Sequence, residues 1–156
     1  MIINNVKLVL EDDVVQGSLE IEGGVIRTFA ESPSSLPEAL DGEGGWLLPG
    51  LIELHTDNLD KFFTPRPKVD WPAHSAMSSH DALMVASGIT TVLDAVAIGD
   101  VRNGGERLEN LEKMINAVEE TQKRGVNRAE HRLHLRCELP HHTTLPLFEK
   151  LVQREP

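Results

Sequence analysis

The sequence contains very little cysteine, with one residue among 156, at position 137. A single cysteine excludes an internal disulfide, and such usage suits a reducing compartment. The first residues lack the basic segment and apolar core of a signal peptide, and no apolar run approaches the roughly 18 residues of a membrane span. We therefore expect a soluble, cytoplasmic protein with no membrane partner.

Positive charge is also scarce. The chain has 15 Lys and Arg against 25 Asp and Glu, which gives a formal net charge of -10. A field of this sign repels nucleic acid, so nucleic acid is not an expected partner. An anionic substrate would need a local group of basic side chains or a bound metal ion. The length and the hydrophobic content of 40% are those of a globular protein with a sizeable core.

Residues 1–48 are predicted to form a small β domain, a β-sandwich element. Val6, Leu8 and Leu10 alternate with polar neighbours, which is the period of a strand. The segments 18–22 and 25–29 flank Gly23-Gly24, a pair that tolerates the positive φ angles of a two-residue hairpin turn.

Residues 49–156 alternate between strand and helix signals, which predicts parallel βαβ units and an α/β fold. Three such units cannot close an eight-stranded barrel, which takes about 250 residues. The fold is then either a small open sheet or part of a larger barrel. The expected strands are 47–54 (short and fully buried), 89–96 and 133–139, and the expected helices run from 78 or 79 to 87, over 108–118 with a stop at Gly125, and from 145 onward.

The strongest chemical signal is the segment 49–57, an apolar run that ends in His55 and Asp57. Positions i and i+2 of a strand share a face, so both side chains can point into one cavity at the carboxyl end of the strand. Imidazole nitrogen and carboxylate oxygen are suitable ligands for a catalytic divalent cation. The alternative is a polar strand end that neighbouring loops satisfy, because an H-x-D triplet alone is common.

Glu138 ends the third expected strand, where a carboxylate could bridge two metal ions. Its alternative role is an ion pair with a nearby Lys or Arg. Its neighbour Cys137 is expected to face the other way, into apolar packing.

The segment 57–71 reads as a long loop between the first strand and the next helix, and loops of this length are often functional. It carries three of the few cations of the chain, which suit a phosphate-bearing substrate unless they are ordinary surface charges. Two histidines that begin the loop after the third strand could also face a ligand or merely be surface groups. These substrate-binding candidates are Lys61, Arg66, Lys68, His141 and His142, whereas His74 and His80 show no pattern that assigns them.

Two motifs, in this order, resemble the amidohydrolase superfamily: Pro49-Gly-Leu-Ile-Glu-Leu-His-Thr-Asp57 and Gly88-Ile-Thr-Thr-Val-Leu-Asp94. The resemblance implies a small β unit followed by a TIM-like (β/α) barrel, here incomplete. It also implies a metal-dependent hydrolase in which His55 and Asp57 bind, and Glu138 bridges, one or two divalent ions. Zn²⁺ is the expected ion and Mn²⁺ is compatible with the same ligands.

The stretches 41–50, 55–67 and 132–140 resemble one branch of that family, which serves phosphonate metabolism in the C–P lyase pathway. This implies a small phosphorylated sugar as substrate, with hydrolysis of a ribose 5-triphosphate to the 5-phosphate and pyrophosphate. A homo-oligomer is compatible with the sequence, which does not specify the oligomeric state. Two other readings stay open. The chain could be a non-catalytic fragment or pseudo-enzyme without the later ligands, or a cyclic amidase of the same superfamily.

Overall fold

The computed structural model of this protein describes residues 1–99 and 106–154. The chain divides into two compact units, Met1–Pro49 and Gly50–Pro156.

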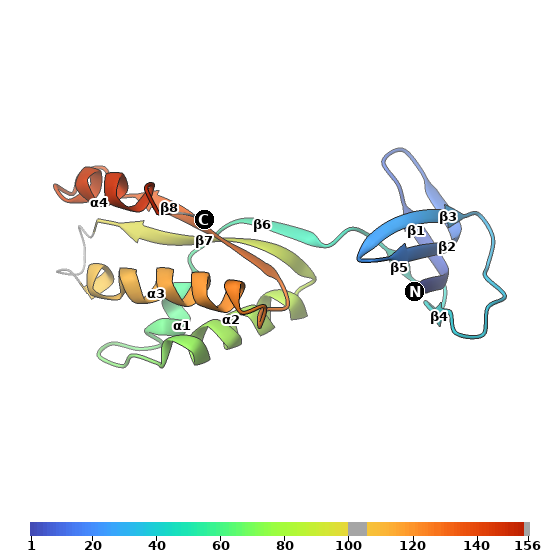
Figure 1. The fold of residues 1–156 in the computed structure, drawn as a ribbon, viewed down its shortest axis with the longest axis horizontal. Coiled ribbons are helices and arrows are strands. Elements are labelled where there is room, and N and C mark those ends of the chain that lie inside the picture. The colour runs from blue at the N-terminus through green and yellow to red at the C-terminus, as the bar shows by residue number, and fades with distance from the viewer. Residues whose placement is uncertain (100–105, 155–156) are drawn as a thin grey trace. The chain divides into compact units, whose positions relative to one another are not determined.

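The first unit is a mixed sheet of five short strands in which β3, β2 and β1 are antiparallel neighbours (Figure 1). Gly23 and Gly24 turn the chain between β2 and β3 at φ angles of 59° and 78°, which confirms the predicted hairpin. Val6, Leu8 and Leu19 form its small core. All five strands belong to one sheet, so the described residues do not show the second layer of a sandwich. The strands are β1 (Ile2–Val9), β2 (Val14–Glu22), β3 (Val25–Ala30), β4 (Leu40–Asp41) and β5 (Trp46–Leu47), the last two parallel to β1.

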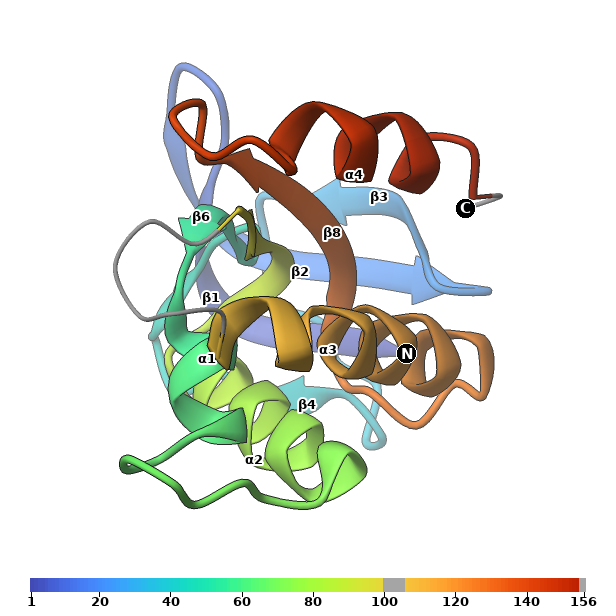
Figure 2. The same ribbon diagram turned by 90° about the vertical axis from the view of Figure 1, so that its left-hand side faces the viewer.

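The second unit has three parallel strands in the order β6-β7-β8, with helices in the connections (Figures 1 and 2). This confirms the α/β class and the parallel βαβ units. The elements are β6 (Leu51–Thr56), α1 (Asn58–Phe63), α2 (Ala73–Ala86), β7 (Ile89–Ile98), α3 (Glu106–Lys123), β8 (Glu130–Cys137) and α4 (Thr144–Leu151).

One face of this sheet packs on the helices, and alternation along the strands decides which side chains lie there. Val96 and Ile98 of β7 belong to the same core as Leu59 of α1 and Ile115 of α3. Cys137 packs against this core, as expected for a residue that faces away from Glu138. The opposite face of the strands is therefore available for the polar side chains described below.

In the described part of the chain, no helix has the length and apolar character needed to cross a membrane.

Two helix predictions need correction. The segment after Asp57 is not simply a loop, because α1 begins at Asn58 and buries Leu59 and Phe63, which lie one turn apart. Helix α2 begins at Ala73, several residues before the expected Ser78 or Ser79. Pro72 precedes it with a φ of -54°, and proline suits the first turn of a helix because its missing N–H has no partner there.

The prediction that the first barrel-type strand is fully buried is wrong for this structure. In β6, Leu51, Ile52 and Leu54 are 59%, 62% and 66% exposed, and only Thr56 is buried. The reason is its position, because within the described residues β6 is an edge strand and β7 is its only partner in the sheet. An apolar run indicates that a strand is suited to burial. It does not show that the described residues pack over that strand.

Candidate metal centre

His55 and Asp57 lie at the carboxyl end of β6 and point to the same side. His55 Nε2 is 3.7 Å from Asp57 Oδ1, and the two side chains are 44% and 50% exposed. This separation is too long for a good hydrogen bond. It is close to the roughly 3.3 Å expected between two ligand atoms that share a tetrahedral ion at 2.0–2.1 Å. The donor types and their spacing therefore fit a divalent cation.

Arg136, which the sequence analysis did not single out, links Glu138 to Asp57. Within the described residues, the donor atoms of His55, Asp57 and Glu138 do not all lie within 4.8 Å of one another. Arg136 donates one hydrogen bond of 2.5 Å to Asp57 Oδ1 and another of 3.1 Å to Glu138 Oε1. Arg136 and Glu138 are two residues apart, at the end of β8, and share a face. The guanidinium thus links the end of β6 with the end of β8. Glu138 does form the ion pair that was its alternative role, and its partner Arg136 also contacts Asp57.

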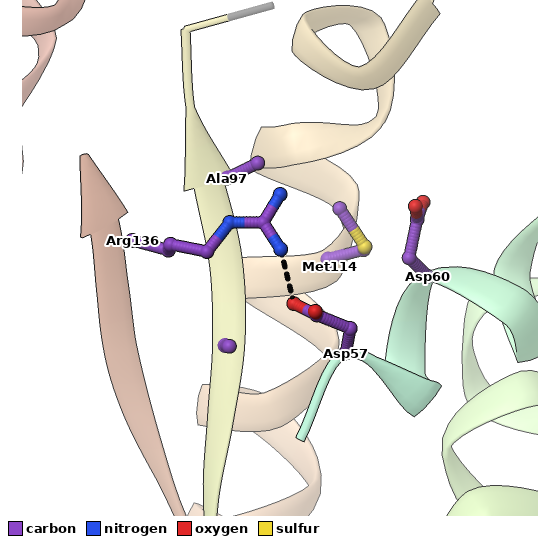
Figure 3. Close-up of a pocket in the computed structure, with 6 residues that line it drawn as sticks. Asp57, Asp60, Ala97, Met114 and Arg136 are labelled. Carbon is purple, nitrogen blue, oxygen red and sulfur yellow. Dashed lines mark hydrogen bonds and ion pairs between the residues drawn. The ribbon is translucent and has the colours of Figure 1, made fainter. Parts of the chain in front are cut away.

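Arg136 reaches Asp57 because the strand between them carries small side chains (Figure 3). Ala97 of β7 is the direct neighbour of Arg136 in the sheet register, and Ala95 is two residues before it. Beneath the guanidinium is a cavity of about 20 Å³, which is room for one water molecule. Its lining comprises Asp57, Asp60, Ala95, Ala97, Met114 and Arg136.

His134 is a second missed residue of this face. Its ring meets that of His55 edge-on, with centroids 4.7 Å apart, and its Nδ1 lies 3.1 Å from the carbonyl oxygen of Leu54. The signal was available in the sequence, because positions 134, 136 and 138 alternate with the apolar 133, 135 and 137. Strand alternation that starts from Glu138 would have placed His134 and Arg136 on the same face.

The other predicted substrate-binding residues lie in separate places. Lys61 contacts Asn58 on α1, and Arg66 lies in a backbone bridge with Val69. Lys68 adopts a positive φ of 63° in that turn. Across the described residues, no hydrogen bond or ion pair joins these three cations to His55 or Asp57.

The two histidines after β8 remain near Glu138 in the chain. His141 and His142 stack with ring centroids 4.6 Å apart, and the backbone N–H of His141 donates to the carbonyl of Glu138. Nδ1 of His141 is 2.8 Å from the hydroxyl of Thr143, so this ring is held by its own turn. The structure gives neither ring a contact with His55.

A second polar cluster lies on the helix-covered face, where the sequence analysis assigned nothing. Asp94 of β7 is fully buried between two histidines. One oxygen is 2.6 Å from Nε2 of His80 on α2, and the other is 2.7 Å from Nδ1 of His131 on β8. The sequence feature that could have predicted this cluster is Asp94 itself, because a carboxylate inside an apolar, β-branched strand needs buried partners.

The cluster continues to Asp81, which is also buried. Nε2 of His131 is 3.3 Å from Asp81 Oδ1, and the backbone N–H groups of Arg128 and Ala129 donate to the same carboxylate. The side chain of Arg128 adds an ion pair of 2.9 Å at the surface. Both carboxylates of this network, Asp81 and Asp94, therefore have basic partners.

His80, Asp94 and His131 offer donor atoms within 4.8 Å of one another, which by type could hold a metal ion. The hydrogen bonds favour another state. Both ring nitrogens of His131 face carboxylates, so both carry protons, whereas a metal ligand needs a free nitrogen lone pair. We interpret this cluster as a charged hydrogen-bond network that joins α2 to the sheet.

The pKa shifts of the network have the directions that its geometry requires. Burial by itself raises the pKa of Asp94, but the hydrogen bonds and charges of His131 and His80 outweigh it and lower the pKa. Burial also raises the pKa of Asp81, and hydrogen bonds, chiefly from Ala129 and Arg128, lower it overall. For His131, burial lowers the pKa, and the two carboxylates raise it overall above the usual 6.5.

These shifts predict a bell-shaped dependence of stability on pH. Above pH 6.5 the unfolded chain releases a proton that folded His131 keeps, so the free energy of unfolding decreases as pH rises through the higher folded pKa. Below pH 3.8 the unfolded chain binds protons that Asp81 and Asp94 do not bind in the folded state. The free energy of unfolding therefore also decreases as pH falls through this range. Thermal unfolding measured across both ranges checks this. A His131→Gln variant should lose most of the alkaline slope, and an unchanged slope would contradict the assignment.

Two comparisons with known proteins concern the family and the fold of the chain. No family model matches the chain. A crystal structure of D-hydantoinase superposes with a TM-score of 0.53 over 99% of this chain and 31% of that protein, at 24% sequence identity. At this identity the likeness concerns the fold alone, and it supports the α/β class that the sequence predicted.

A second comparison concerns sequence. The chain is 91% identical over all 156 residues to the alpha-D-ribose 1-methylphosphonate 5-triphosphate diphosphatase of Escherichia coli (strain K12). The match covers 41% of that protein, an N-terminal portion, so the chain spans about two fifths of the length of this relative. The resemblance predicted from the sequence is therefore confirmed, and the relative is an enzyme, a hydrolase of phosphonate metabolism.

Proposed function

We propose that this chain supplies the first metal ligands and the first βα units of a diphosphatase that hydrolyses α-D-ribose 1-methylphosphonate 5-triphosphate to the 5-phosphate and pyrophosphate. The observation that carries the proposal is the 91% identity to an enzyme of that name, together with His55 and Asp57 on one face at 3.7 Å. In this proposal β6, β7 and β8 are the first strands of a (β/α) barrel, and the substrate is a small phosphorylated sugar.

The residues that would hold the ion are His55, Asp57 and Glu138, whose nitrogen and oxygen donors suit Zn²⁺ and also accept Mn²⁺. When bound, the ion lowers the pKa of a water molecule and offsets charge that develops on phosphate oxygens. His55 would add an imidazole nitrogen donor, and the two carboxylates would supply the negative charge that attracts the cation. Lys61, Arg66, Lys68, His141 and His142 stay proposed contacts of the polyphosphate.

The test is release of pyrophosphate from the triphosphate by this chain and by a version extended to the length of the relative. We expect the extended version to be active with Zn²⁺ or Mn²⁺ and a chelator to abolish that activity, because the nucleophile depends on the ion. Activity that survives complete metal removal would overturn the proposal. Hydrolysis of hydantoin in place of pyrophosphate release would favour the cyclic amidase reading.

The chain spans 41% of the length of the relative, and a non-catalytic role for these 156 residues by themselves is the second candidate. Activity of the short chain alone would refute this reading. Activity of the extended version only would support it.

A further inference from the structure

Arg136 places a positive charge on the carboxylate oxygen that is proposed to bind the metal ion. Its guanidinium bonds Oδ1 of Asp57, which is the same oxygen that lies 3.7 Å from Nε2 of His55. A divalent ion held by this histidine and this oxygen would lie next to a guanidinium that already uses the oxygen. Two cations on one carboxylate oxygen repel each other, so the ion and Arg136 compete for Asp57.

The second carboxylate is in the same situation. Arg136 donates to Oε1 of Glu138 at 3.1 Å, so one guanidinium partly neutralises both acidic groups proposed as ligands. The three side chains together carry a formal charge of -1. A divalent ion in place of Arg136 on these carboxylates would balance them, and the guanidinium charge would then be left without a partner.

The surroundings of Arg136 leave its guanidinium room to bind another anion. Its side chain is 27% exposed and lies over Ala95 and Ala97, which offer little steric hindrance. Its buried Nε has no hydrogen-bond partner among the described residues. A phosphate group is commonly bound by two parallel N–H donors of a guanidinium, and Nε is available as one of them.

We propose that Arg136 is the counter-ion that a divalent metal displaces from Asp57 and Glu138, and that the released guanidinium then binds a phosphate group of the substrate. This inference rests on the proposed function and adds a residue to it. It makes metal binding a precondition for anion binding. It also supplies a cation at the site in a chain whose net charge is -10, where Arg136 is the one cation lining the cavity within the described residues.

The first experiment measures the affinity of the metal-free chain for Mn²⁺ by calorimetry. Arg136→Met should bind Mn²⁺ about tenfold more tightly, because the competing charge is gone while partial exposure screens the effect. Arg136→Lys keeps the charge and should stay near the wild type. Arg132→Met is the matched control, because Arg132 lies on the same face of β8 but pairs with Glu130, and it should change nothing.

Weaker or unchanged Mn²⁺ binding by Arg136→Met would overturn the competition, and weaker binding would mean that Arg136 orients the carboxylates instead. If the wild type binds no Mn²⁺, or if His55→Asn binds it as tightly as the wild type does, the proposed metal site itself fails. The two failures are therefore distinct. Circular dichroism of each variant confirms that the fold is kept.

The second experiment measures binding of ribose 5-phosphate at saturating Mn²⁺. The wild type should bind it, and Arg136→Met should bind it at least about tenfold more weakly, since a bidentate charged contact is lost. Without Mn²⁺ both proteins should bind it poorly, because the carboxylates occupy the guanidinium of the wild type and the variant has none. Equal binding by both proteins at saturating Mn²⁺ would overturn the anion-binding half of the proposal.

Discussion

Replacing His55 with asparagine is expected to weaken binding of Mn²⁺ or Zn²⁺ by at least about 100-fold. Residues that only orient a metal ligand contribute 10–100-fold to affinity, and a direct ligand contributes no less. The imidazole nitrogen of His55 lies 3.7 Å from Asp57 Oδ1, and its replacement leaves two carboxylates that Arg136 already contacts. Titration of the metal-free chain by calorimetry measures the loss.

The matched control is His74→Asn, which removes an exposed histidine of α2 that pairs with Glu120 at 2.9 Å. Its metal affinity should equal that of the wild type. If His55→Asn also binds metal normally, imidazole is not a ligand here and the centre has to be sought elsewhere. In the extended enzyme, the same substitution should remove pyrophosphate release in parallel with the loss of metal.

The predictions from sequence succeeded where local chemistry alone decides the structure. Gly23-Gly24 specify a hairpin because few other residues adopt two successive positive φ angles. Leu111, Ile115 and Val118 are buried on α3 as their helical spacing predicts, and Gly125 follows the helix with a φ of 62°. These signals concern neighbours in the chain and need no knowledge of the packing.

The predictions failed where the answer depends on distant segments. The exposure of Leu51, Ile52 and Leu54 follows from the place of β6 at the edge of the described sheet, which the residues themselves cannot report. The start of β8 at Glu130 rather than Leu133 follows from pairing of Thr91 with Glu130 across the sheet.

The same division holds for the site. The alternation rule gave the common face of His55 and Asp57, because both lie within three residues. The contact of Arg136 with Asp57 spans 79 residues and depends on the small side chains of β7. The network around Asp94 joins three elements, and only the presence of a carboxylate in an apolar strand hinted at it. Long-range polar contacts are therefore the part that the sequence alone did not specify.

The largest loss of stability is expected from Asp94→Asn. The substitution keeps the shape of the side chain but removes the charge that balances His131, and it turns an amide N–H₂ toward a ring that also donates. Breaking a buried ion pair by removal of one partner costs about 3–5 kcal/mol. Urea unfolding should therefore show a decrease of about 3 kcal/mol or more, the lower figure applying because His131 can release its proton. The fluorescence of Trp71, in a Trp46→Phe background, reports the second unit alone.

Glu120→Gln supplies the matched comparison, because it also turns a carboxylate into an amide. Its partner His74 lies on the same helix as His80, and each histidine meets a carboxylate at less than 3 Å. The pair of His74 with Glu120 is exposed, and exposed pairs contribute about 0–1 kcal/mol. The difference between the two losses therefore measures what burial adds to the same chemistry. Equal losses would show that Asp94 is not held by charge, and that the buried histidines are neutral neighbours which the fold tolerates rather than requires.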